Sequence, residues 1–411
     1  MPVLVRRWLQ SALLLFTSAF LAGCSGDYPQ TTFEPVSEFG RILNRLFANT
    51  FWWTIGILVL VELLILVAMF KFKERPGTPK PKQIHGNVKL EFLWTVIPAV
   101  IVLFIAIPTI QVTIETQRQP PEDALVVEVI GHQWWWEYRY PEYNVNTANE
   151  LVLPVGRNID LKMHSADVIH SFWIPRVGGK RDVNPLPRIG PGEKTPASNH
   201  LTFNIEEPGY YSGQCAEFCG MAHATMRAAV IAMPASEFEQ WAVSMGGRPG
   251  GPAVPPQAPP QQPADTLSAR DTLNQRAGAP AQPAVTPAPA PQTPAPGSLQ
   301  GPATPAGPLS EADRGKQLFT SRVCIACHTI NGTSARGVLG PNLTRFGARR
   351  TIGAGARPNT LENVIAWITN PQAVKPGALM PGARTDGGGM KATGMTAEEV
   401  RAIATYLTSL K

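Results

Sequence analysis

Residues 215–226 read CAEFCGMAHATM and place two thiols, an imidazole and a thioether within one short loop. Thiolate, imidazole and thioether are ligands that suit copper, and a single Cys-His-Met loop with an upstream His would form a mononuclear site. Here a second cysteine, Cys219, follows Cys215 in the same loop. Both sulfurs can therefore bridge a pair of metal ions, which leaves one His and one weaker ligand for each ion. The stretch predicts a two-metal centre.

A further imidazole for this centre lies upstream, in the run DVIHSFW at residues 167–173. The run is rich in β-branched and aromatic residues, so His170 is expected on a strand. The alternative for the loop is a structural disulfide between its two cysteines, because thiols oxidise outside the cytoplasm. A disulfide would not explain why His170, His223 and Met226 stand at ligand spacing.

Together these residues resemble the binuclear CuA site of subunit II of the haem-copper oxidases. The resemblance implies six copper ligands, one of them a backbone carbonyl: His170, Cys215, Cys219, His223, Met226 and the carbonyl of Glu217. In that family the carboxylate at the Glu217 position also helps to bind a magnesium ion where subunit II meets subunit I.

The composition indicates several domains and a linker. The 411 residues are enough for two or three domains, and 41 prolines with 36 glycines exceed what folded domains use. The net charge of +6 could suggest a nucleic-acid partner. However, the basic residues form no long run and no nucleic-acid motif accompanies them, so we expect no such partner.

The N-terminus predicts a lipoprotein-type signal peptide over residues 1–23. Arg6 and Arg7 precede an apolar core, and the pattern LAGCS follows at 21–25. This pattern resembles the bacterial lipobox, which implies cleavage before Cys24 and lipidation of that residue. The alternatives are an ordinary signal peptide and a buried cysteine.

Residues 24–120 predict a transmembrane hairpin. Two apolar runs, at 51–70 and 92–113, are each long enough to cross the hydrocarbon layer as a helix. The connection between them is rich in lysine and also contains an arginine, so it is expected on the cytoplasmic side. Both outer ends would then lie outside, in agreement with the signal peptide. The expected location is the bacterial inner membrane, with the later domains on the periplasmic side.

Two carboxylates in this hairpin need an interpretation, because charge inside a membrane is costly. Glu62 has no motif around it and is interpreted as a hydrogen-bonding group that faces a helix or a subunit. Glu91 begins the second helix in LEFLWTVIP, residues 90–98, which resembles the subunit II segment with the glutamate at the mouth of a proton-uptake path. The alternative for Glu91 is an interfacial carboxylate without a transport role.

Residues 121–245 predict an all-β domain. Short β-branched and aromatic runs alternate with turn residues, which is typical of antiparallel strands. With the copper loop between its last strands, this domain should be a cupredoxin-like Greek-key sandwich or barrel. The segment GHQWWWEY at 131–138 resembles the family's aromatic segment and implies that Trp134 admits electrons; the alternative is plain packing. The run NPLPRIGP at 184–191 departs from the family pattern, which places docking onto the catalytic subunit in doubt.

Residues 246–308 hold 17 of the 41 prolines, with much Ala, Gly and Gln, and predict a disordered linker. The domain after it, at 309–411, contains CIACH at 324–328. Cys-x-x-Cys-His is the c-type haem attachment signature, with two thiols for the vinyl groups and a proximal imidazole. Zinc would need further Cys or His ligands, and none follows His328.

The haem iron therefore needs a sixth ligand from another residue type, and methionine is the expected one. Met380, Met390 and Met395 are the candidates. KPGALMP at 375–381 resembles the cytochrome c ligand loop, so Met380 is predicted to be axial with His328. The thiols of Cys324 and Cys327 would carry the haem in a small all-α cytochrome c domain.

The resemblance covers nearly the whole chain and is to subunit II of a cytochrome-c-fused, caa-type cytochrome oxidase. It implies electron flow from a soluble or membrane-bound donor to haem c, then to CuA, then to the haem-copper centre of subunit I, where dioxygen is reduced and protons are translocated. Other oxidase subunits would be partners. The alternatives are a CuA-containing nitric or nitrous oxide reductase subunit and a membrane-tethered electron carrier or copper-delivery protein.

Overall fold

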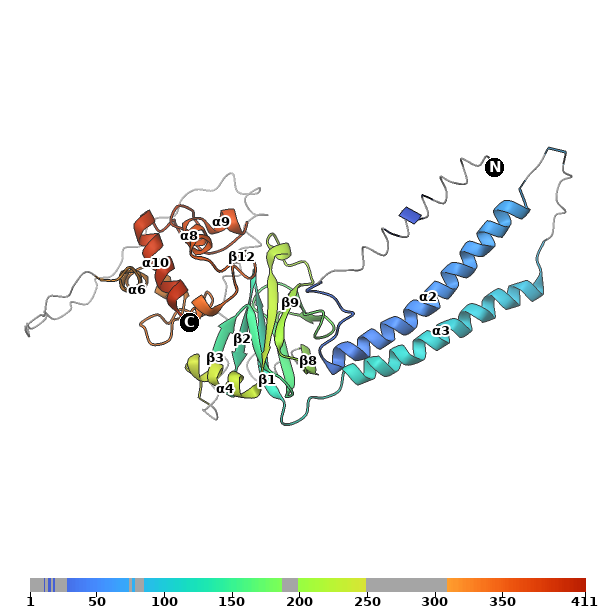
Figure 1. Ribbon diagram of the computed structural model, residues 1–411, viewed down its shortest axis with the longest axis horizontal. Helices are drawn as coiled ribbons and strands as arrows, with labels where there is room; N and C mark the ends of the chain where they lie inside the picture. The colour runs from blue at the N-terminus through green and yellow to red at the C-terminus, as the bar shows by residue number, and fades with distance from the viewer. Residues whose placement is uncertain are drawn as a thin grey trace, which may run out of the picture. The chain divides into compact units, whose positions relative to one another are not determined.

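The computed structural model describes residues 28–73, 76–77, 85–186, 199–248 and 309–411, together with positions 11, 14, 15 and 18 (Figure 1). Apart from those four positions, the predicted signal peptide lies outside the described residues, as do the predicted lipidation site and the predicted linker from residue 249 onward. The chain divides into two compact units, residues 1–165 with 169–251 and residues 166–168 with 252–411. The first unit holds a helical hairpin and a β-sandwich, and the second holds a helical domain.

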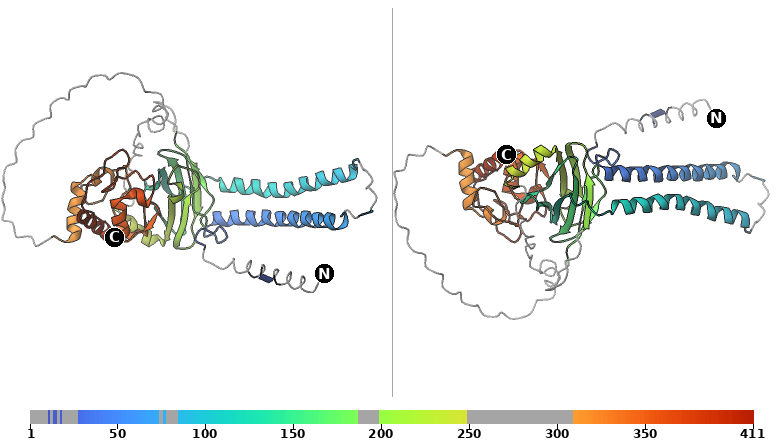
Figure 2. Two further views of the ribbon diagram at one scale, coloured as in Figure 1. Left: turned by 90° about the horizontal axis from the view of Figure 1, so that it is seen from above. Right: turned by 90° about the horizontal axis from the view of Figure 1, so that it is seen from below.

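Two long helices form the hairpin, α2 (Glu38–Lys71) and α3 (Val88–Thr116), and they lie side by side (Figure 2). Both are long and apolar enough to cross a membrane. Trp53 of α2 stacks on Phe104 of α3 with ring centroids 5.8 Å apart. Each helix extends beyond the predicted span at both ends, because hydropathy marks the apolar part of a helix and not its hydrogen-bonded ends.

The first turns of α2 pack into the β domain. Ser37 caps the helix and donates its hydroxyl to the Val177 carbonyl. Phe39 lies so close to Gly178 that a Cβ there would be 2.8 Å from its ring. Arg41 pairs with Glu206 at 2.5 Å. The β-sandwich is thereby joined to the hairpin by packed and hydrogen-bonded contacts as well as by the chain.

The β domain consists of two five-stranded sheets, in the orders β3-β2-β1-β5-β8 and β4-β10-β9-β6-β7. The first sheet contains β1 (Leu125–His132), β2 (Trp135–Tyr140), β3 (Val145–Ala148), β5 (Asn158–Ser165) and β8 (Asn199–Asn204). The second contains β4 (Glu150–Pro154), β6 (His170–Trp173), β7 (Arg181–Val183), β9 (Gly209–Cys215) and β10 (Arg227–Met233). A short helix, α4 (Ala235–Ser244), follows β10.

The all-β expectation is confirmed, but the pairing is mixed. β1 pairs with β5 and β4 with β10 in parallel, whereas the other ladders of the two sheets are antiparallel. Parallel neighbours come from distant parts of a chain, so alternation within one strand does not reveal them. Alternate residues of β1 and β2 point between the sheets and are fully buried, among them Val127, Trp136 and Tyr138.

The C-terminal domain is built on a pair of packed helices, α6 (Glu311–Ser321) and α10 (Ala397–Ser409). Between them lie α7 (Cys324–Cys327), the 3-10 turn η2 (Phe346–Ala348), the hairpin β11 (Thr351–Ile352) and β12 (Arg357–Pro358), and the helices α8 (Leu361–Thr369) and α9 (Pro371–Val374). Thr396 and Glu399 form a capping box at the start of α10. The small hairpin is an addition to the predicted helical domain.

Candidate metal centre and haem site

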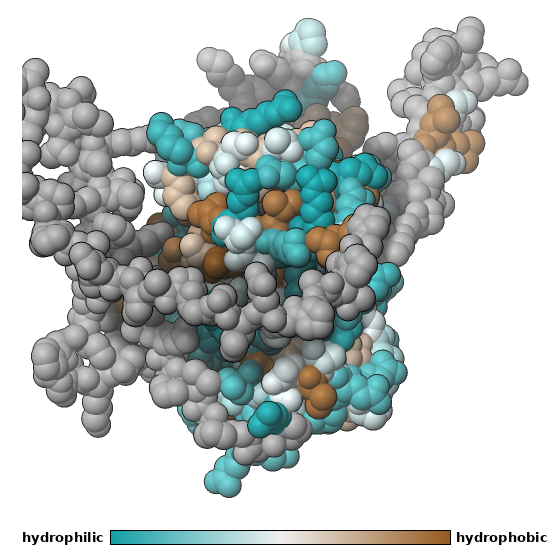
Figure 3. Space-filling view, turned by 90° about the vertical axis from the view of Figure 1, so that its left-hand side faces the viewer, coloured by the Kyte–Doolittle hydropathy of each residue, from teal (hydrophilic) through white to brown (hydrophobic). Residues whose placement is uncertain are grey.

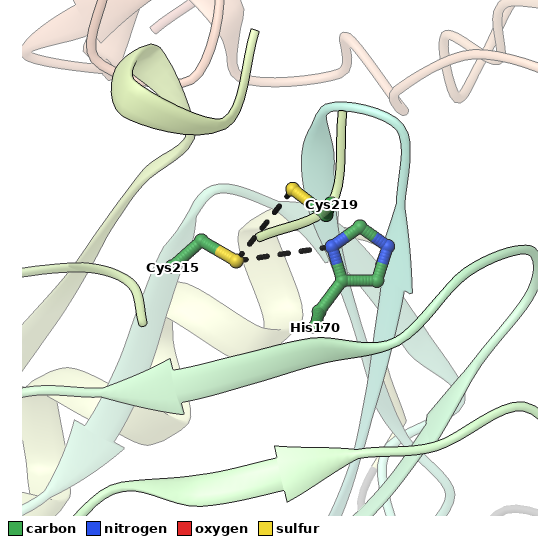
Figure 4. Close-up of side chains that lie close together, drawn as sticks. All are labelled: His170, Cys215 and Cys219. Carbon is green, nitrogen blue, oxygen red and sulfur yellow. Dashed lines mark hydrogen bonds between the residues drawn. The ribbon is translucent and has the colours of Figure 1, made fainter. Parts of the chain in front are cut away.

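Three predicted copper ligands meet in the interior of the β domain. The side chains of His170, Cys215 and Cys219 are each less than 5% exposed, and their ligand atoms lie within 4.8 Å of one another. The two sulfurs are 3.8 Å apart, and the Cys215 sulfur lies 3.9 Å from the His170 Nδ1 (Figure 4). Neither cysteine forms a disulfide.

The other three predicted ligands surround the same two sulfurs. His223 Nδ1 lies 3.6 Å from the Cys219 sulfur, and the Met226 sulfur lies 3.8 Å from it. The Glu217 carbonyl oxygen lies 3.3 Å from the Cys215 sulfur, while the Glu217 side chain is exposed. The structure therefore brings all six predicted ligands of the sequence into one cluster.

These separations fit metal ions shared by the two thiolates. With bonds of about 2.3 Å to sulfur and about 2.0 Å to nitrogen, as in zinc sites, ligand atoms around one tetrahedral ion lie about 3.5–3.8 Å apart. The observed sulfur–sulfur, sulfur–nitrogen and sulfur–thioether separations are 3.6 to 3.9 Å. The set of two thiolates, two imidazoles and a thioether is soft, which excludes magnesium and suits copper, the divalent ion that such nitrogen and sulfur sites bind most tightly.

The cluster also favours the thiolate form that binds metal. The Cys219 thiol and the His170 ring lower the pKa of Cys215 by hydrogen bonding, against its burial, which raises it. A thiolate is the form that a metal ion requires, and a lowered pKa makes it available near neutral pH. The chain alone thus favours the thiolate of Cys215.

Two neighbouring strands and one loop place these groups. His170 begins β6 and Cys215 ends β9, and the two strands pair at Phe172 and Cys215. The Cys215 amide donates to the Met226 carbonyl at 2.9 Å, which closes the ligand loop at its base. Gly131 of β1 lies under the imidazole, and a Cβ there would be 2.7 Å from the His170 ring.

The turn between β1 and β2 contacts the backbone of the second cysteine. The indole nitrogen of Trp134 donates to the Cys219 carbonyl at 2.9 Å, which places the predicted electron-entry residue directly against the ligand loop. Gln133 donates to the same carbonyl at 2.8 Å. Sequence reasoning missed Gln133, although its place beside Trp134 in the GHQW segment was an available signal.

The haem attachment residues lie together at α7. Cys324 and Cys327 are half-buried at the two ends of this helical turn, and His328 follows them. His328 Nδ1 donates to the Pro341 carbonyl at 2.8 Å, because a carbonyl only accepts. Nδ1 therefore carries the proton, and Nε2 remains for iron. Burial lowers the pKa of His328, which favours the neutral ring. This arrangement fits covalently attached haem.

The three candidate methionines differ in their surroundings. Met380 is partly buried and packs on the same hydrophobic core as Cys324. Met395 is 8% exposed and belongs to that core. Met390 lines a pocket of about 530 Å³ together with Val323 and Pro381, next to the first haem thiol and the predicted ligand loop.

The coloured surface in Figure 3 is mostly hydrophilic, with small hydrophobic patches.

Three family models match the chain, and together they span the two described units. "Cytochrome C oxidase subunit II, transmembrane domain" matches residues 36–112, "Cytochrome C oxidase subunit II, periplasmic domain" matches 143–233, and "Cytochrome c" matches 312–411. Cytochrome c oxidase subunit 2 of Alkalihalophilus pseudofirmus is 30% identical over 406 residues, which cover 97% of this chain and 96% of that relative. The chain belongs to the cytochrome c oxidase subunit 2 family.

The comparisons also match a second full-length relative and a solved structure. Cytochrome c oxidase subunit 2 of Bacillus subtilis is 28% identical over 434 residues, which cover 99% of both chains. The crystal structure of the periplasmic domain of subunit II of cytochrome oxidase from Bradyrhizobium japonicum is 30% identical and covers 31% of this chain and 97% of that chain, with a TM-score of 0.27.

As a cytochrome c oxidase subunit 2, the chain is a component of an oxidoreductase complex in a membrane. The predicted fusion of a subunit II with a C-terminal cytochrome c domain is confirmed, and so is the predicted fold class. The matched families imply copper and haem c as cofactors and other oxidase subunits as partners.

Glu91, the predicted proton-path residue of this subunit 2, lies in the first turn of α3. Its carboxylate accepts a hydrogen bond from the backbone N–H of Asn87 at 3.0 Å. The Asn87 side chain caps the same helix. Glu62 lies in the middle of α2 and is exposed on the isolated chain. The carboxylate of Glu91 thus has a capping contact in addition to its predicted role.

Proposed function

We propose that this chain is the electron-entry subunit of a respiratory terminal oxidase. It would receive electrons from a soluble or membrane-bound donor and pass them through haem c and a binuclear CuA centre to the haem-copper centre of subunit I, where dioxygen is reduced to water and protons are translocated. The observation that carries the proposal is the cluster of two thiols, two imidazoles and a thioether in a chain that also holds a c-type haem attachment motif.

The residues of the copper domain would have three tasks in this function. Cys215 and Cys219 would bridge the two ions, with His170, His223, Met226 and the Glu217 carbonyl completing their coordination. The bound copper pair supplies a one-electron centre whose charge is shared between two ions. The exposed Glu217 carboxylate is free to help bind magnesium at the junction with subunit I. Trp134 would admit electrons, because its indole touches the carbonyl of a bridging cysteine.

The remaining predicted residues would attach the haem, admit protons and anchor the chain to the membrane. Cys324 and Cys327 would hold haem c, with His328 and Met380 on its two faces. Glu91 would lie at the inner mouth of a proton path, with both redox domains on the periplasmic side of the bacterial inner membrane. Residues 1–23 would be removed, and Cys24 would carry lipid. The domain limits proposed are 24–120, 121–245, 246–308 and 309–411.

The test is spectroscopy and kinetics on the purified membrane complex that contains the full chain. We expect a multi-line EPR signal from a mixed-valence copper pair, a c-type haem spectrum, and oxygen consumption. After a flash that starts turnover, haem c should be oxidised as electrons pass to the copper pair. A complex that reduces nitric or nitrous oxide and not oxygen would favour the reductase alternative. Copper that leaves the chain for an acceptor protein, without electron transfer, would favour copper delivery.

A further inference from the structure

Glu137 is a buried carboxylate that none of the functions above uses. It lies on β2 with 4% of its surface exposed. Three groups bond to it: the His132 ring at 2.9 Å, the Arg139 guanidinium at 2.6 Å and the Asn146 amide at 2.8 Å. Although burial raises the pKa of Glu137, the bond from His132 and the charge of Arg139 lower it to about 2. The carboxylate is therefore ionised near neutral pH and accepts bonds from three neighbouring groups.

The network is attached to the turn that covers the copper loop. His132 ends β1 and pairs with Trp135 at the start of β2, so Gln133 and Trp134 form the turn between them. The His132 ring stacks on the Trp135 ring, with centroids 4.2 Å apart and planes within 6°. The Glu137 carboxylate thus holds one side of the base of this turn through His132, and the stack holds the other.

Two side chains of this turn contact the ligand loop. Gln133 and Trp134 donate to the Cys219 carbonyl at 2.8 and 2.9 Å. Gly220, with φ of 114°, allows the ligand loop to approach, since a Cβ there would be 3.0 Å from both side chains. A displacement of the turn by a few tenths of an ångström would therefore move the backbone of a bridging thiolate.

We propose that Glu137 is a positioning residue for the copper centre, which fixes the 131–134 turn through His132 so that Gln133 and Trp134 hold the Cys219 carbonyl in place. This inference rests on the proposed function, because it assumes that the cluster binds copper. Partners that orient metal ligands from outside the coordination sphere are worth about 10–100-fold in metal affinity or activity. The Glu137 carboxylate acts through His132 and the turn and does not touch a ligand itself, so we expect an effect at the low end of that range.

The first experiment replaces Glu137 in the full-length chain within its complex. Glu137→Gln keeps the size of the side chain but places an NH2 group among donors, which loosens the bond to His132. We expect copper affinity, measured by competition with a copper chelator, to fall by about tenfold. We also expect the hyperfine pattern of the copper EPR signal to change. Glu142→Gln is the matched control, because Glu142 pairs with Arg157 at 2.9 Å on the surface and lies outside the network.

A second variant breaks the same contact from the other side. His132→Phe keeps a ring to stack on Trp135 and leaves Glu137 bonded to Arg139 and Asn146, so this variant decides the question if Glu137→Gln does not fold. It should reproduce the loss of copper affinity and the altered EPR pattern. Both signals unchanged in a folded variant that lacks the Glu137–His132 contact would overturn the role of Glu137. Absence of copper from the unmodified chain would count instead against the proposed function.

Discussion

The proposed copper cluster and the proposed haem site would hold their cofactors by different means. In the β domain, ladders between β6 and β9 and the closed ligand loop bring buried sulfurs and nitrogens to within 4 Å of one another. In the C-terminal domain, the two haem thiols are only half-buried. A stiff sandwich can prepare a set of ligands in advance, whereas a small helical domain depends on covalent bonds to a large group that becomes part of its core.

The largest effect is expected from the removal of one bridge of the copper pair. Cys219→Ser replaces a thiolate with a hydroxyl, which does not share a pair of copper ions, so the multi-line EPR signal should disappear completely. The β domain should remain folded, because its core lies between the sheets. Met221→Leu is the control, since Met221 is an exposed residue of the same loop. An unchanged multi-line spectrum in Cys219→Ser would exclude the bridged copper pair.

The corresponding change in the other domain should affect folding as well as cofactor content. Replacing both Cys324 and Cys327 with serine leaves no thiol for the haem vinyl groups, so covalently bound haem should be lost. We expect the cooperative thermal transition of this domain to be lost too, because the haem would supply much of its buried apolar surface. The copper EPR signal should persist. Haem staining and calorimetry of the full chain measure both, and a preserved transition would contradict the difference between the sites.

The sequence indicated the candidate ligands of both sites more directly than the surroundings of either. Ligand types and their spacing are local properties, so CAEFCGMAHATM and CIACH could be read directly. The parallel pairing of β1 with β5 and of β4 with β10 joins distant segments, and no local period encodes it. Glu137 lies in an ordinary charged and aromatic strand pattern. Only the pairing of β1 with β2 reveals its contact with His132.

Within the haem site, the methionines offer a sharper test. Met380→Leu should leave the haem attached but lower its reduction potential by at least about 59 mV, a tenfold change in the equilibrium constant of a one-electron couple, because thioether ligation raises the potential. Met390→Leu is the matched control, because Met390 lines the pocket next to Pro381. A redox titration of the c-type absorption band compares them. If Met390→Leu lowers the potential and Met380→Leu does not, Met380 is the wrong ligand.

Glu91 lies at the far end of the hairpin from the copper domain, so proton entry can be separated from electron entry. Glu91→Gln removes the ionisable group, while its amide oxygen can still accept the hydrogen bond from Asn87. Oxygen consumption should fall severalfold, whereas flash-initiated oxidation of haem c should keep its rate. Glu115→Gln, at the opposite end of α3, is the control. Undiminished turnover would return Glu91 to a capping and interfacial role.

The smallest effect concerns acid stability and applies to the β domain. Burial lowers the pKa of His164 to about 4; the charges of Arg139 and His132 lower it too, while Glu137 opposes them. The folded domain therefore keeps this ring neutral at a pH at which the unfolded chain takes up a proton.

Stability should consequently be unaffected by this group above about pH 6.5, decrease as the pH falls towards about 4, and change no further below that value. Allowing for partial exposure, the loss amounts to about 1–2 kcal/mol. His164→Gln cannot take up the proton, so its melting temperature should fall less than that of the unmodified chain between pH 7.5 and pH 5. His85→Gln, at an exposed position before α3, should behave like the unmodified chain. His164 lies across Ile130 from Glu137 in the same sheet. An equal fall in His164→Gln would mean that acid acts on other groups of the sandwich, and that keeping the His164 ring neutral does not stabilise the domain.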